Sequence, residues 1–264
     1  MTGLANERAR VLSNEEVGPG LHVLRLESPG IAGSILPGQF VHMRIPSLES
    51  HILRRPFSVY ACDSHDGTLE ILYQVVGSVT ALMPNMSDSV VELIGPVGNT
   101  WKRTANRALI VGGGVGAAPL FMLTEELVES GCNVDVVLGA QTEAALVCRE
   151  RYERLLGRNP ECATDDGTYG RPGFCTTLVE ERLSEGTVVG GEPYEYVAVC
   201  GPVPLMKIVA GKAADAGVPC EVSMEKRMAC GVGACLSCVV DTVNGKRRSC
   251  VDGPIFDAQE VVWR

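Results

Sequence analysis

The sequence lacks several features that would place it in common classes of protein. Its 23 Lys and Arg residues are outnumbered by 32 Asp and Glu residues, which gives a formal net charge of −9 and a pI near 5.0. An acidic chain of this kind is not expected to bind nucleic acid or anionic membranes broadly. Residues 1–10 contain no apolar core like that of a secretory signal. The longest uncharged run, residues 108–124, holds four glycines and Pro119 and is shorter than a membrane span. We therefore expect a cytoplasmic protein.

The cysteine content also argues against one class of protein. Eleven cysteines are present, an odd number without an export signal, so a disulfide framework explains them poorly. Seven lie outside a cysteine-rich stretch near the C-terminal end, and we interpret most of these as small buried hydrophobic side chains. They are Cys62, Cys132, Cys148, Cys162, Cys175, Cys200 and Cys220. The length of 264 residues, with 45% hydrophobic and 21% charged residues, indicates a globular protein of two or three modules without internal repeats.

The cysteine-rich stretch, residues 224–238, is the strongest signal of chemistry. Cys230, Cys235 and Cys238 are spaced C-x4-C-x2-C, and Cys250 follows after eleven intervening residues. This is the plant-type ligand pattern of a [2Fe–2S] cluster, whose irons accept soft thiolate ligands. Glycines between the first two cysteines give the backbone the freedom to wrap round such a cluster. Zinc is the alternative, but it usually prefers paired C-x2-C units, and only one is present. We therefore predict a [2Fe–2S] cluster on these four cysteines.

Residues 7–100 have the pattern of a small antiparallel barrel. Short runs at 21–26, 39–45 and 69–76 alternate or are β-branched, and turn signals containing Pro and Gly separate them. Several short strands at this spacing predict one closed sheet.

Two motifs in this region carry groups suited to phosphate. Arg54 and Arg55 precede Pro56 and Ser58; arginine binds phosphate oxygens in a bidentate way, and the serine is a donor for a flavin ring edge. Taken alone, an exposed pair of arginines is more often solvated surface. At residues 77–83 the alternation gives way to a helical pattern that opens on Gly-Ser-Val-Thr. Such a turn binds an anion or is an ordinary helix N-cap, and the residues leave both interpretations open.

Residues 107–140 have the order strand, glycine-rich turn, helix and strand. The buried strand 107–111 is followed by Gly-Gly-Gly-Val-Gly at 112–116, a helix from 117 to about 129, and a strand at 133–140. In such a βαβ unit the glycines let a diphosphate approach backbone N–H groups at the start of the helix. A purely structural turn is the alternative, but four glycines in five residues favour phosphate binding.

The pattern continues as an α/β fold to about residue 218. We expect a helix over 142–156, a loop-rich stretch over 158–174, a helix over 176–183, a buried strand over 194–199 and a helix over 204–216. Ligands of open α/β sheets gather at the carboxyl ends of the strands, which places Cys200 and Gly201 near the glycine-rich turn. Asp165 and Asp166 are a candidate contact for a nicotinamide or ribose, although such a pair is more often a solvated turn.

The last module begins near residue 219 and contains the cysteine-rich stretch. Strand-like runs on both sides of Asn244-Gly245 predict a hairpin. A module this small is expected to need its metal cluster in order to fold.

Together these motifs resemble the ferredoxin–NAD(P) reductase superfamily. The Arg-Pro-Phe-Ser motif, the GGGVGAAPL turn and the Cys-Gly-Pro after a strand carry this resemblance, and their order is more specific than any one of them. The added MACGVGACLSC, with SCVDGPIFD after it, looks like the electron-transfer subunits of NAD-dependent dihydroorotate dehydrogenases. The resemblance implies three modules. They are a FAD-binding antiparallel β-barrel at 1–102, an NAD-binding doubly wound α/β domain with a parallel sheet at 103–218, and a small C-terminal [2Fe–2S] module at 219–264.

The resemblance also implies roles for individual residues. Those expected to bind FAD are Arg55, Pro56, Phe57 and Ser58, then Leu72, Tyr73 and Gln74, and then Gly77, Ser78, Val79 and Thr80 of the pyrophosphate turn. Val79 stands where the family usually has a second glycine, and a side chain there limits how closely backbone approaches phosphate. Those expected to hold the NAD diphosphate are Gly112, Gly113, Gly114, Val115 and Gly116. Cys200 and Gly201 are expected beside the nicotinamide, Cys200 either as a catalytic residue or as a packing neighbour.

The activity that the resemblance implies is electron transfer in pyrimidine biosynthesis. A partner subunit carrying FMN oxidises dihydroorotate, and electrons pass singly through the cluster to FAD, which reduces NAD+ by hydride transfer. The expected assembly is a heterotetramer of two subunits of each kind. Gln141-Thr142-Glu143, after the second α/β strand, offers no arginine for a 2′-phosphate, which favours NAD over NADP.

Two other functions stay open. Similar chains are small subunits of NAD-dependent ferredoxin:NADP oxidoreductases or of sulfide dehydrogenase-type complexes, which more often have glycine after the second cysteine, where this chain has Leu236. A non-enzymatic redox sensor or zinc-stapled binding module is the third possibility, and the flavin motif and glycine-rich turn argue against it.

Overall fold

The computed structural model describes residues 3–45, 53–86, 88–102, 104–185 and 192–263. The chain divides into two compact units. The first comprises residues 1–100, 224–241 and 245–255, and the second comprises 101–223, 242–244 and 256–264. The segment that follows residue 223 therefore contributes to both units.

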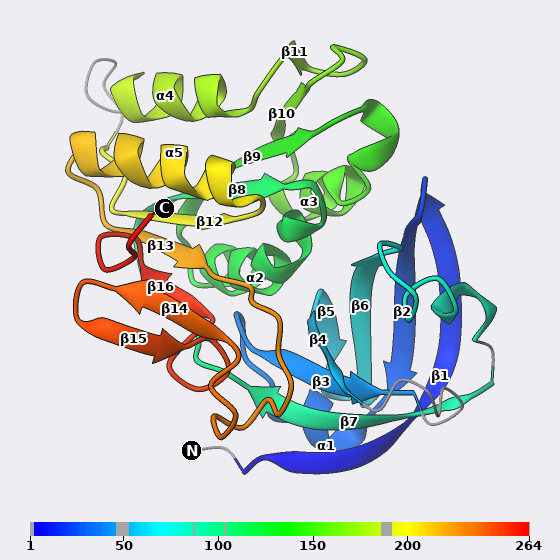
Figure 1. The fold of residues 1–264 in the computed structure, drawn as a ribbon. Coiled ribbons are helices and arrows are strands. Elements are labelled where there is room, and N and C mark those ends of the chain that lie inside the picture. Colours follow the sequence, from blue (N-terminus) through cyan, green and yellow to red (C-terminus); the bar gives the residue numbers. More distant parts are fainter. Residues whose placement is uncertain (1–2, 46–52, 87, 103, 186–191, 264) are drawn as a thin grey trace. The chain divides into compact units, whose positions relative to one another are not determined.

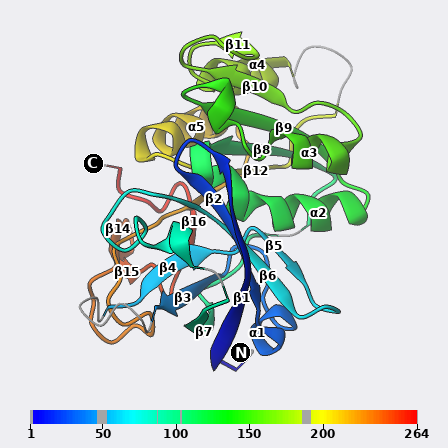
Figure 2. The same ribbon diagram turned by 90° about the vertical axis from the view of Figure 1, so that its right-hand side faces the viewer.

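The first unit is built on an antiparallel sheet of seven strands (Figures 1 and 2). The strands are β1 (Ala5–Gly18), β2 (Leu21–Glu27), β3 (Phe40–Arg44), β4 (Arg55–Ser58), β5 (Ala61–Asp63), β6 (Thr68–Gln74) and β7 (Val90–Val97), with the short helices α1 (Pro29–Ala32) and η1 (Met83–Asn85). Their order in the sheet is β4-β3-β7-β1-β2-β6-β5. Strands β4 and β5 lie at opposite ends of this order, yet only two residues connect them. The sheet therefore curves round on itself, as the predicted barrel requires.

The second unit is an α/β sandwich around a second sheet of seven strands. The strands are β8 (Arg107–Gly113), β9 (Asn133–Ala140), β10 (Glu161–Thr164), β11 (Arg171–Pro172), β12 (Tyr196–Cys200), β13 (Cys220–Ser223) and β16 (Ile255–Asp257), in the order β11-β10-β9-β8-β12-β13-β16. Every pairing from β11 to β13 is parallel. Residues 108–111 are fully buried, as expected of a strand covered on both faces.

Helices cover both faces of this parallel sheet. They are η2 (Gly114–Leu120), α2 (Phe121–Glu129), η3 (Glu143–Ala145), α3 (Arg149–Leu156), α4 (Thr176–Glu185) and α5 (Val203–Asp215). Helices α2 and α3 lie on one face, and α4 and α5 lie on the other (Figure 1). From β8 the chain adds β9, β10 and β11 on one side of β8, and it then adds β12 on the other side of β8. The direction in which strands are added therefore reverses between β8 and β12. Open α/β sheets bind ligands at such a switch point.

Three local predictions were wrong. The helix expected over 142–156 is two pieces, η3 and α3, because Leu146 leaves helical geometry (φ −81°, ψ 43°) and, with Cys148, is buried in the break. The loop expected over 158–174 contains β10 and β11, since the run from 161 to 164 pairs with β9. The helix expected from Gly77 is a series of turns that ends in η1.

The other expected elements are confirmed. Helices α4 and α5 lie where the sequence predicted helices at 176–183 and 204–216. The hairpin predicted around Asn244-Gly245 is formed by β14 (Val239–Thr242) and β15 (Gly245–Arg248).

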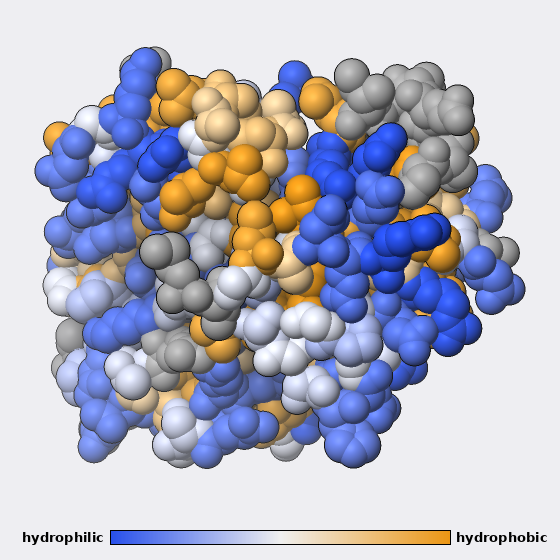
Figure 3. All heavy atoms as spheres, turned by 90° about the horizontal axis from the view of Figure 1, so that it is seen from below, coloured by the Kyte–Doolittle hydropathy of each residue, from blue (hydrophilic) through white to orange (hydrophobic). Residues whose placement is uncertain are grey.

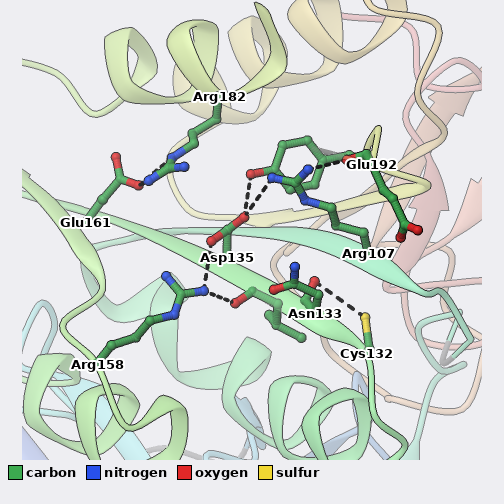
Figure 4. A network of polar contacts seen from close by, with 10 residues as sticks. Arg107, Cys132, Asn133, Asp135, Arg158, Glu161, Arg182 and Glu192 are labelled. Carbon is green, nitrogen blue, oxygen red and sulfur yellow. Dashed lines mark hydrogen bonds and ion pairs between the residues drawn. The ribbon is translucent and has the colours of Figure 1, made fainter. Parts of the chain in front are cut away.

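A buried ionic cluster lies at the amino-terminal edge of the parallel sheet (Figure 4). Asp135, near the start of β9, is 6% exposed and accepts a 2.6 Å hydrogen bond from the Tyr194 hydroxyl and a 2.8 Å bond from Arg158 Nη2. Arg107 lies 3.5 Å from the same carboxylate and 4.4 Å from the centre of the Tyr194 ring. Burial alone would raise the pKa of Asp135, but the hydrogen bonds from Tyr194 and Arg158 and the charges of Arg158 and Arg182 outweigh it and lower the pKa. The cluster occupies the edge opposite the glycine-rich turn.

No helix among the described residues is long and apolar enough to cross a membrane. On the face drawn in Figure 3, hydrophilic side chains predominate around groups of apolar ones.

Candidate cofactor sites

A pocket of about 810 Å³ in the first unit is lined by both predicted flavin motifs. Arg55, Pro56 and Ser58 come from β4, and residues 77–80 come from the turn after β6. The other lining residues are Phe40, Leu53, Val76, Glu225, Lys226, Arg227, Met228 and Pro254. The volume lies in the range of small-molecule and cofactor sites. Apolar walls beside guanidinium and hydroxyl groups fit a flavin nucleotide, which has a flat ring and a diphosphate.

The two neighbouring arginines have different surroundings. Arg54 donates from Nη1 to the Glu92 carbonyl at 2.8 Å, and its Nη2 lies 3.2 Å from the Glu92 carboxylate. Arg54 is therefore committed to strand β7, and only Arg55 lines the pocket. Of the pair, Arg55 is the one placed to bind phosphate.

Four residues predicted to bind FAD do not line the pocket. Phe57 makes an edge-to-face contact with Tyr73, with ring centres 6.3 Å apart, and the Tyr73 hydroxyl donates to Asn14 Oδ1 at 3.2 Å. Leu72 and Tyr73 are 7% and 3% exposed, whereas Gln74 is exposed. Their contact with flavin stays a prediction.

The turn at 77–80 is held together by one side chain. Thr80 Oγ1 accepts hydrogen bonds from the backbone N–H groups of Val76 and Gly77, each at 3.0 Å, and donates to the Gly77 carbonyl at 3.1 Å. Val79 is 7% exposed and forms part of the pocket wall. Thr80 therefore closes a turn and is not the N-cap of a helix, which one interpretation expected; the turn lines the pocket, as the other interpretation requires.

Sequence reasoning missed Glu225 as a pocket residue. The Ser58 hydroxyl donates to Glu225 Oε1 at 3.3 Å, and both side chains line the pocket. Glu225 as a residue is exposed, yet the protein atoms around its carboxylate desolvate that group and raise its pKa. The hydrogen bond from Ser58 partly offsets this rise. The one available signal was its place five residues before the first cluster cysteine.

The glycine-rich turn lies against the end of β12. Gly112 pairs with Cys200 in the parallel ladder, which confirms that the two strand ends meet. A Cβ atom on Gly116 would lie 2.7 Å from the carbonyl carbon and oxygen of Cys200, and one on Gly113 would lie 2.5 Å from Leu205 Cδ2. Close packing thus explains these two glycines, while Gly114 has a left-handed φ of +57°. Cys200 is 2% exposed, so its thiol is part of a packed layer.

The carboxyl edge of the sheet also collects acidic residues. The N–H groups of Asp165 and Asp166 donate to the carbonyls of Ala140 and Gln141 at 3.0 and 3.2 Å. The loop after β10 therefore lies beside the end of β9, on the edge that holds the glycine-rich turn. Hydrogen bonds from Thr168 lower the pKa of Asp166. This edge suits ribose hydroxyls better than an additional phosphate.

The four cluster cysteines differ in exposure and in their contacts. Cys238 and Cys250 are each 2% exposed, with their Sγ atoms 3.3 Å apart. Cys230 Sγ accepts from the backbone N–H groups of Val232 and Cys235, each at 3.5 Å. Cys235 is exposed, and hydrogen bonding to Ser237 lowers its pKa to about 6. Backbone N–H groups aimed at sulfur are the contacts that stabilise and tune an iron–sulfur cluster.

The arrangement of the sulfur atoms distinguishes a two-iron centre from zinc. Tetrahedral zinc with Zn–S distances of about 2.3 Å needs four sulfurs mutually about 3.8 Å apart. Within the described ranges, the one group of three ligating side chains whose atoms lie within 4.8 Å of one another is the exposed Asp63, His65 and Asp66, not the cysteines. The close Cys238–Cys250 pair, apart from the other two, fits a cluster that spreads its ligands over two irons.

Comparison with protein families matches two parts of the chain. Residues 225–262 match the iron-sulfur cluster binding domain of dihydroorotate dehydrogenase B, and residues 110–211 match the oxidoreductase NAD-binding domain. Among curated proteins, the chain is 35% identical to the dihydroorotate dehydrogenase B (NAD(+)) electron transfer subunit of Desulforamulus reducens, with 97% of both chains covered. It is 34% identical to the protein of the same name from Bacillus caldolyticus, with 98% of this chain and 99% of that one covered.

Among solved structures, the chain resembles an NADH-dependent reduced ferredoxin-NADP oxidoreductase that carries out flavin-based electron bifurcation. The TM-score is 0.84 at 27% identity, covering 97% of this chain and 90% of that one. The ferredoxin reductase of carbazole 1,9a-dioxygenase matches with a TM-score of 0.68 at 21% identity, covering 82% of this chain and 67% of that one, which shows a shared fold.

Proposed function

The chain belongs to the family of dihydroorotate dehydrogenase B (NAD(+)) electron transfer subunits, and from this premise we propose that it carries electrons from the FMN of a catalytic subunit to NAD+. Its cofactors are a [2Fe–2S] cluster, FAD and NAD. When bound, the cluster supplies one-electron transfer and FAD supplies the exchange between single electrons and a hydride.

One observation in the structure carries this proposal. The flavin pocket is lined on one side by Arg55, Ser58 and the turn at 77–80, and on the other by residues 225–228, which lead directly into the first cluster cysteine. A protein that only bound NAD, or only bound a metal, would not need the flavin motifs and the segment before the cluster cysteines to line the same pocket. The arrangement supports electron transfer between cluster and flavin inside the first unit.

The residues of the chain divide this work between them. Arg55 binds phosphate, and Ser58 and Glu225 form a polar pair that orients the flavin ring edge. Cys230, Cys235, Cys238 and Cys250 ligate the cluster. In the second unit, the turn at 112–116 and Gly201 hold the NAD diphosphate and nicotinamide, and Cys200 lies beside the nicotinamide, where it takes part in the chemistry or packs against the ring.

The partner that we propose is an FMN-containing subunit that oxidises dihydroorotate, in a heterotetramer of two subunits of each kind, in the cytoplasm. The seven cysteines outside the proposed cluster are not in disulfides in the structure, which suits a reducing compartment. Exposed apolar side chains surround the cluster cysteines: Val232, Leu236 and Val251 are 48%, 62% and 45% exposed. Such residues are commonly covered by a partner, and they support docking near the cluster.

The experiment is anaerobic co-expression with a candidate FMN-containing subunit, followed by an assay of dihydroorotate-dependent NAD+ reduction. We expect activity that needs both chains. In the Cys235→Ser variant we expect dihydroorotate-dependent NAD+ reduction to disappear, while FAD content and assembly of the complex persist. Cys62→Ser, a cysteine outside the cluster, serves as the matched control and is expected to retain activity.

A second function is favoured by the structural match to a ferredoxin-NADP oxidoreductase. It predicts a different result in the same experiment: the two chains do not associate, yet this chain alone binds FAD and a [2Fe–2S] cluster and passes electrons from NADH to an artificial acceptor. That outcome would assign the chain to a ferredoxin- or sulfide-linked complex.

A further inference from the structure

Strand β3 lies beside β4, which carries the predicted flavin motif, and against the loop that contains Cys230. Its ladder pairs Phe40 with Ser58 and His42 with Pro56, so it runs directly beside the flavin motif of β4. Side chains alternate along the strand. Val41 and Met43, which are 0% and 1% exposed, are paired with Phe57 and Arg55, whereas Phe40 and His42 belong to the other face.

That other face of β3 supports the cluster cysteines. Phe40 packs in one buried group with Cys238 and Cys250, two of the four predicted ligands. The His42 ring lies against Gly231, the residue that follows Cys230: a Cβ atom on Gly231 would be 2.5 Å from His42 Nδ1. Gly231 has a φ of +70° and reaches this position because it has no side chain. One strand face therefore contacts both halves of the ligand set.

His42 is unusual among the buried polar side chains. It is 0% exposed, and neither ring nitrogen has a hydrogen-bond partner of normal geometry in the part of the chain that the structure describes. Burial, aided by the positive charges of Arg54 and Arg55, lowers its pKa to about 4, which the backbone of Arg54 and of Cys230 opposes. The imidazole, which offers a donor and an acceptor nitrogen, lies between β4 and the loop that contains Cys230.

Buried polar groups of this kind are rarely left without a purpose. An unpaired buried donor or acceptor is costly, so the two ring nitrogens of His42 call for partners. The groups at hand for it are the backbone at Cys230 and the backbone at Arg54. Hydrogen bonds from the ring to both would fix the loop that contains Cys230 relative to the chain segment that leads into β4.

We propose that His42 is a positioning residue for the iron–sulfur loop: its buried imidazole packs against Gly231 and holds the backbone at Cys230 in the conformation that ligates the cluster. This inference rests on the proposed function, because it takes the four cysteines to carry a cluster. It adds a residue outside the cysteine motif and about 190 positions away in sequence, in line with the rule that residues supporting the ligands share in control of a metal site.

The test compares variants at position 42 in the complex purified anaerobically. His42→Ala removes the ring, His42→Phe keeps a ring without polar atoms, and His42→Asn keeps a polar group that can meet the backbone. Val41→Ala is the matched control, because it shortens a fully buried side chain on the opposite face of the same strand. The readouts are the rate of iron release to a chelator, the electron paramagnetic resonance spectrum of the reduced cluster, and FAD content.

We expect His42→Ala and His42→Phe to release iron roughly 10- to 100-fold faster than the unaltered protein, with shifted g values and normal FAD content. His42→Asn is expected to lie closer to the unaltered protein than either, and Val41→Ala to leave the spectrum unchanged. Because Asn and Phe report on the role even where Ala does not fold, the set of variants decides the question.

Three results would overturn the inference. One is an unaltered release rate and spectrum in both His42→Ala and His42→Phe. Another is recovery by Phe equal to that by Asn, since this would mean that bulk alone matters. The third is an equal effect of Val41→Ala. If the unaltered protein itself holds no iron, the proposed function fails together with the inference, whereas an intact cluster that ignores position 42 removes the inference alone.

Discussion

Single residues in the glycine-rich turn have distinct tasks that the motif itself does not reveal. Four glycines in the turn at 112–116 are alike as a sequence pattern, but the structure separates them. Gly116 faces the carbonyl of Cys200 at a distance that excludes a side chain, whereas Gly114 has open space around its Cα and a left-handed φ. Gly116 is required by packing between η2 and the end of β12, and Gly114 by its backbone conformation.

This difference predicts unequal effects of two alanine substitutions. Gly116→Ala places a methyl group 2.7 Å from rigid backbone at Cys200, so η2 and the end of β12 must separate at the position proposed for the nicotinamide. We expect FAD reduction by NADH to slow roughly 100-fold, as small misplacements at reacting centres do, with FAD and iron content unchanged. Gly114→Ala should cost only about 1–2 kcal/mol of stability through its backbone conformation. Stopped-flow reduction and thermal unfolding measure the two effects, and rapid reduction of Gly116→Ala would contradict the assignment.

The arginine pair shows the same limit of the motif. Arg54 and Arg55 are adjacent and chemically identical, so the sequence offers both to a phosphate. Only the position of Glu92 on β7, brought near by the barrel, commits Arg54 to a structural ion pair. A contact between residues 38 positions apart depends on the closed sheet, which a local motif does not contain.

Among the elements, the turn at 76–80 depends on one hydroxyl group. Thr80 Oγ1 binds the N–H groups of Val76 and Gly77, and each such bond is worth about 1 kcal/mol. Thr80→Val keeps the shape and removes the acceptor, so the turn loosens and we expect FAD to bind about tenfold more weakly, equivalent to about 1.4 kcal/mol. Thr80→Ser keeps the hydroxyl and should bind nearly normally. Titration of the apoprotein with FAD, followed by flavin fluorescence, checks both, and equal affinities in the two variants would refute the role.

The ionic cluster at the amino edge of the parallel sheet predicts a dependence of stability on pH. Against the opposing effect of burial, the hydrogen bond from Tyr194 helps to lower the pKa of Asp135 below its ordinary 3.8. This stabilisation is complete above 3.8 and is lost as the pH falls from there through the lowered pKa of the folded protein. Tyr194→Phe removes the bond and should destabilise the protein by about 1–3 kcal/mol at neutral pH. Because the pKa of Asp135 then lies higher, the difference between the two proteins should shrink as the medium is acidified.

Urea unfolding between about pH 3 and 7 measures this difference. Tyr169→Phe is the control, since Tyr169 is only partly buried and its hydroxyl meets the Arg149 side chain rather than a buried carboxylate. Surface changes of that kind usually alter stability by less than about 0.5 kcal/mol. A gap between Tyr194→Phe and the unaltered protein that stays constant with pH would show that the hydroxyl does not act through Asp135.

Secondary structure was predictable where the pattern is long and was missed where tertiary contacts decide it. The fully apolar run of β8 and the helices α4 and α5 were visible because their own residues specify them. Strand β10 has four residues and was missed, since its pairing with β9 defines it. The break at Leu146 was missed for the same reason, as burial of that side chain competes with helix continuation.

The cofactor sites divide in the same way. Spacing predicts the cysteine ligands, because three of the four lie on one loop and such a pattern is local. Glu225 and His42 were missed, since each acquires its neighbour only when residues 224–238 fold onto the barrel. A glutamate and a strand histidine have no local sequence signature of their own. Their roles depend on residues that are distant in sequence: Ser58 and Glu225, for example, lie 167 positions apart.

For the chain as a whole, the division into two units predicts unfolding in two transitions. The first unit holds the four cysteines and the flavin pocket, and the second holds the glycine-rich turn. Because a ligand stabilises only the folded unit that binds it, removing iron with a chelator should lower one transition and leave the other in place, while NADH should raise only the second. Scanning calorimetry of loaded and iron-free protein, each with and without NADH, tests this. A single transition that both treatments move together would mean that the units unfold as one, and that the segment after residue 223, which contributes to both, couples their stabilities.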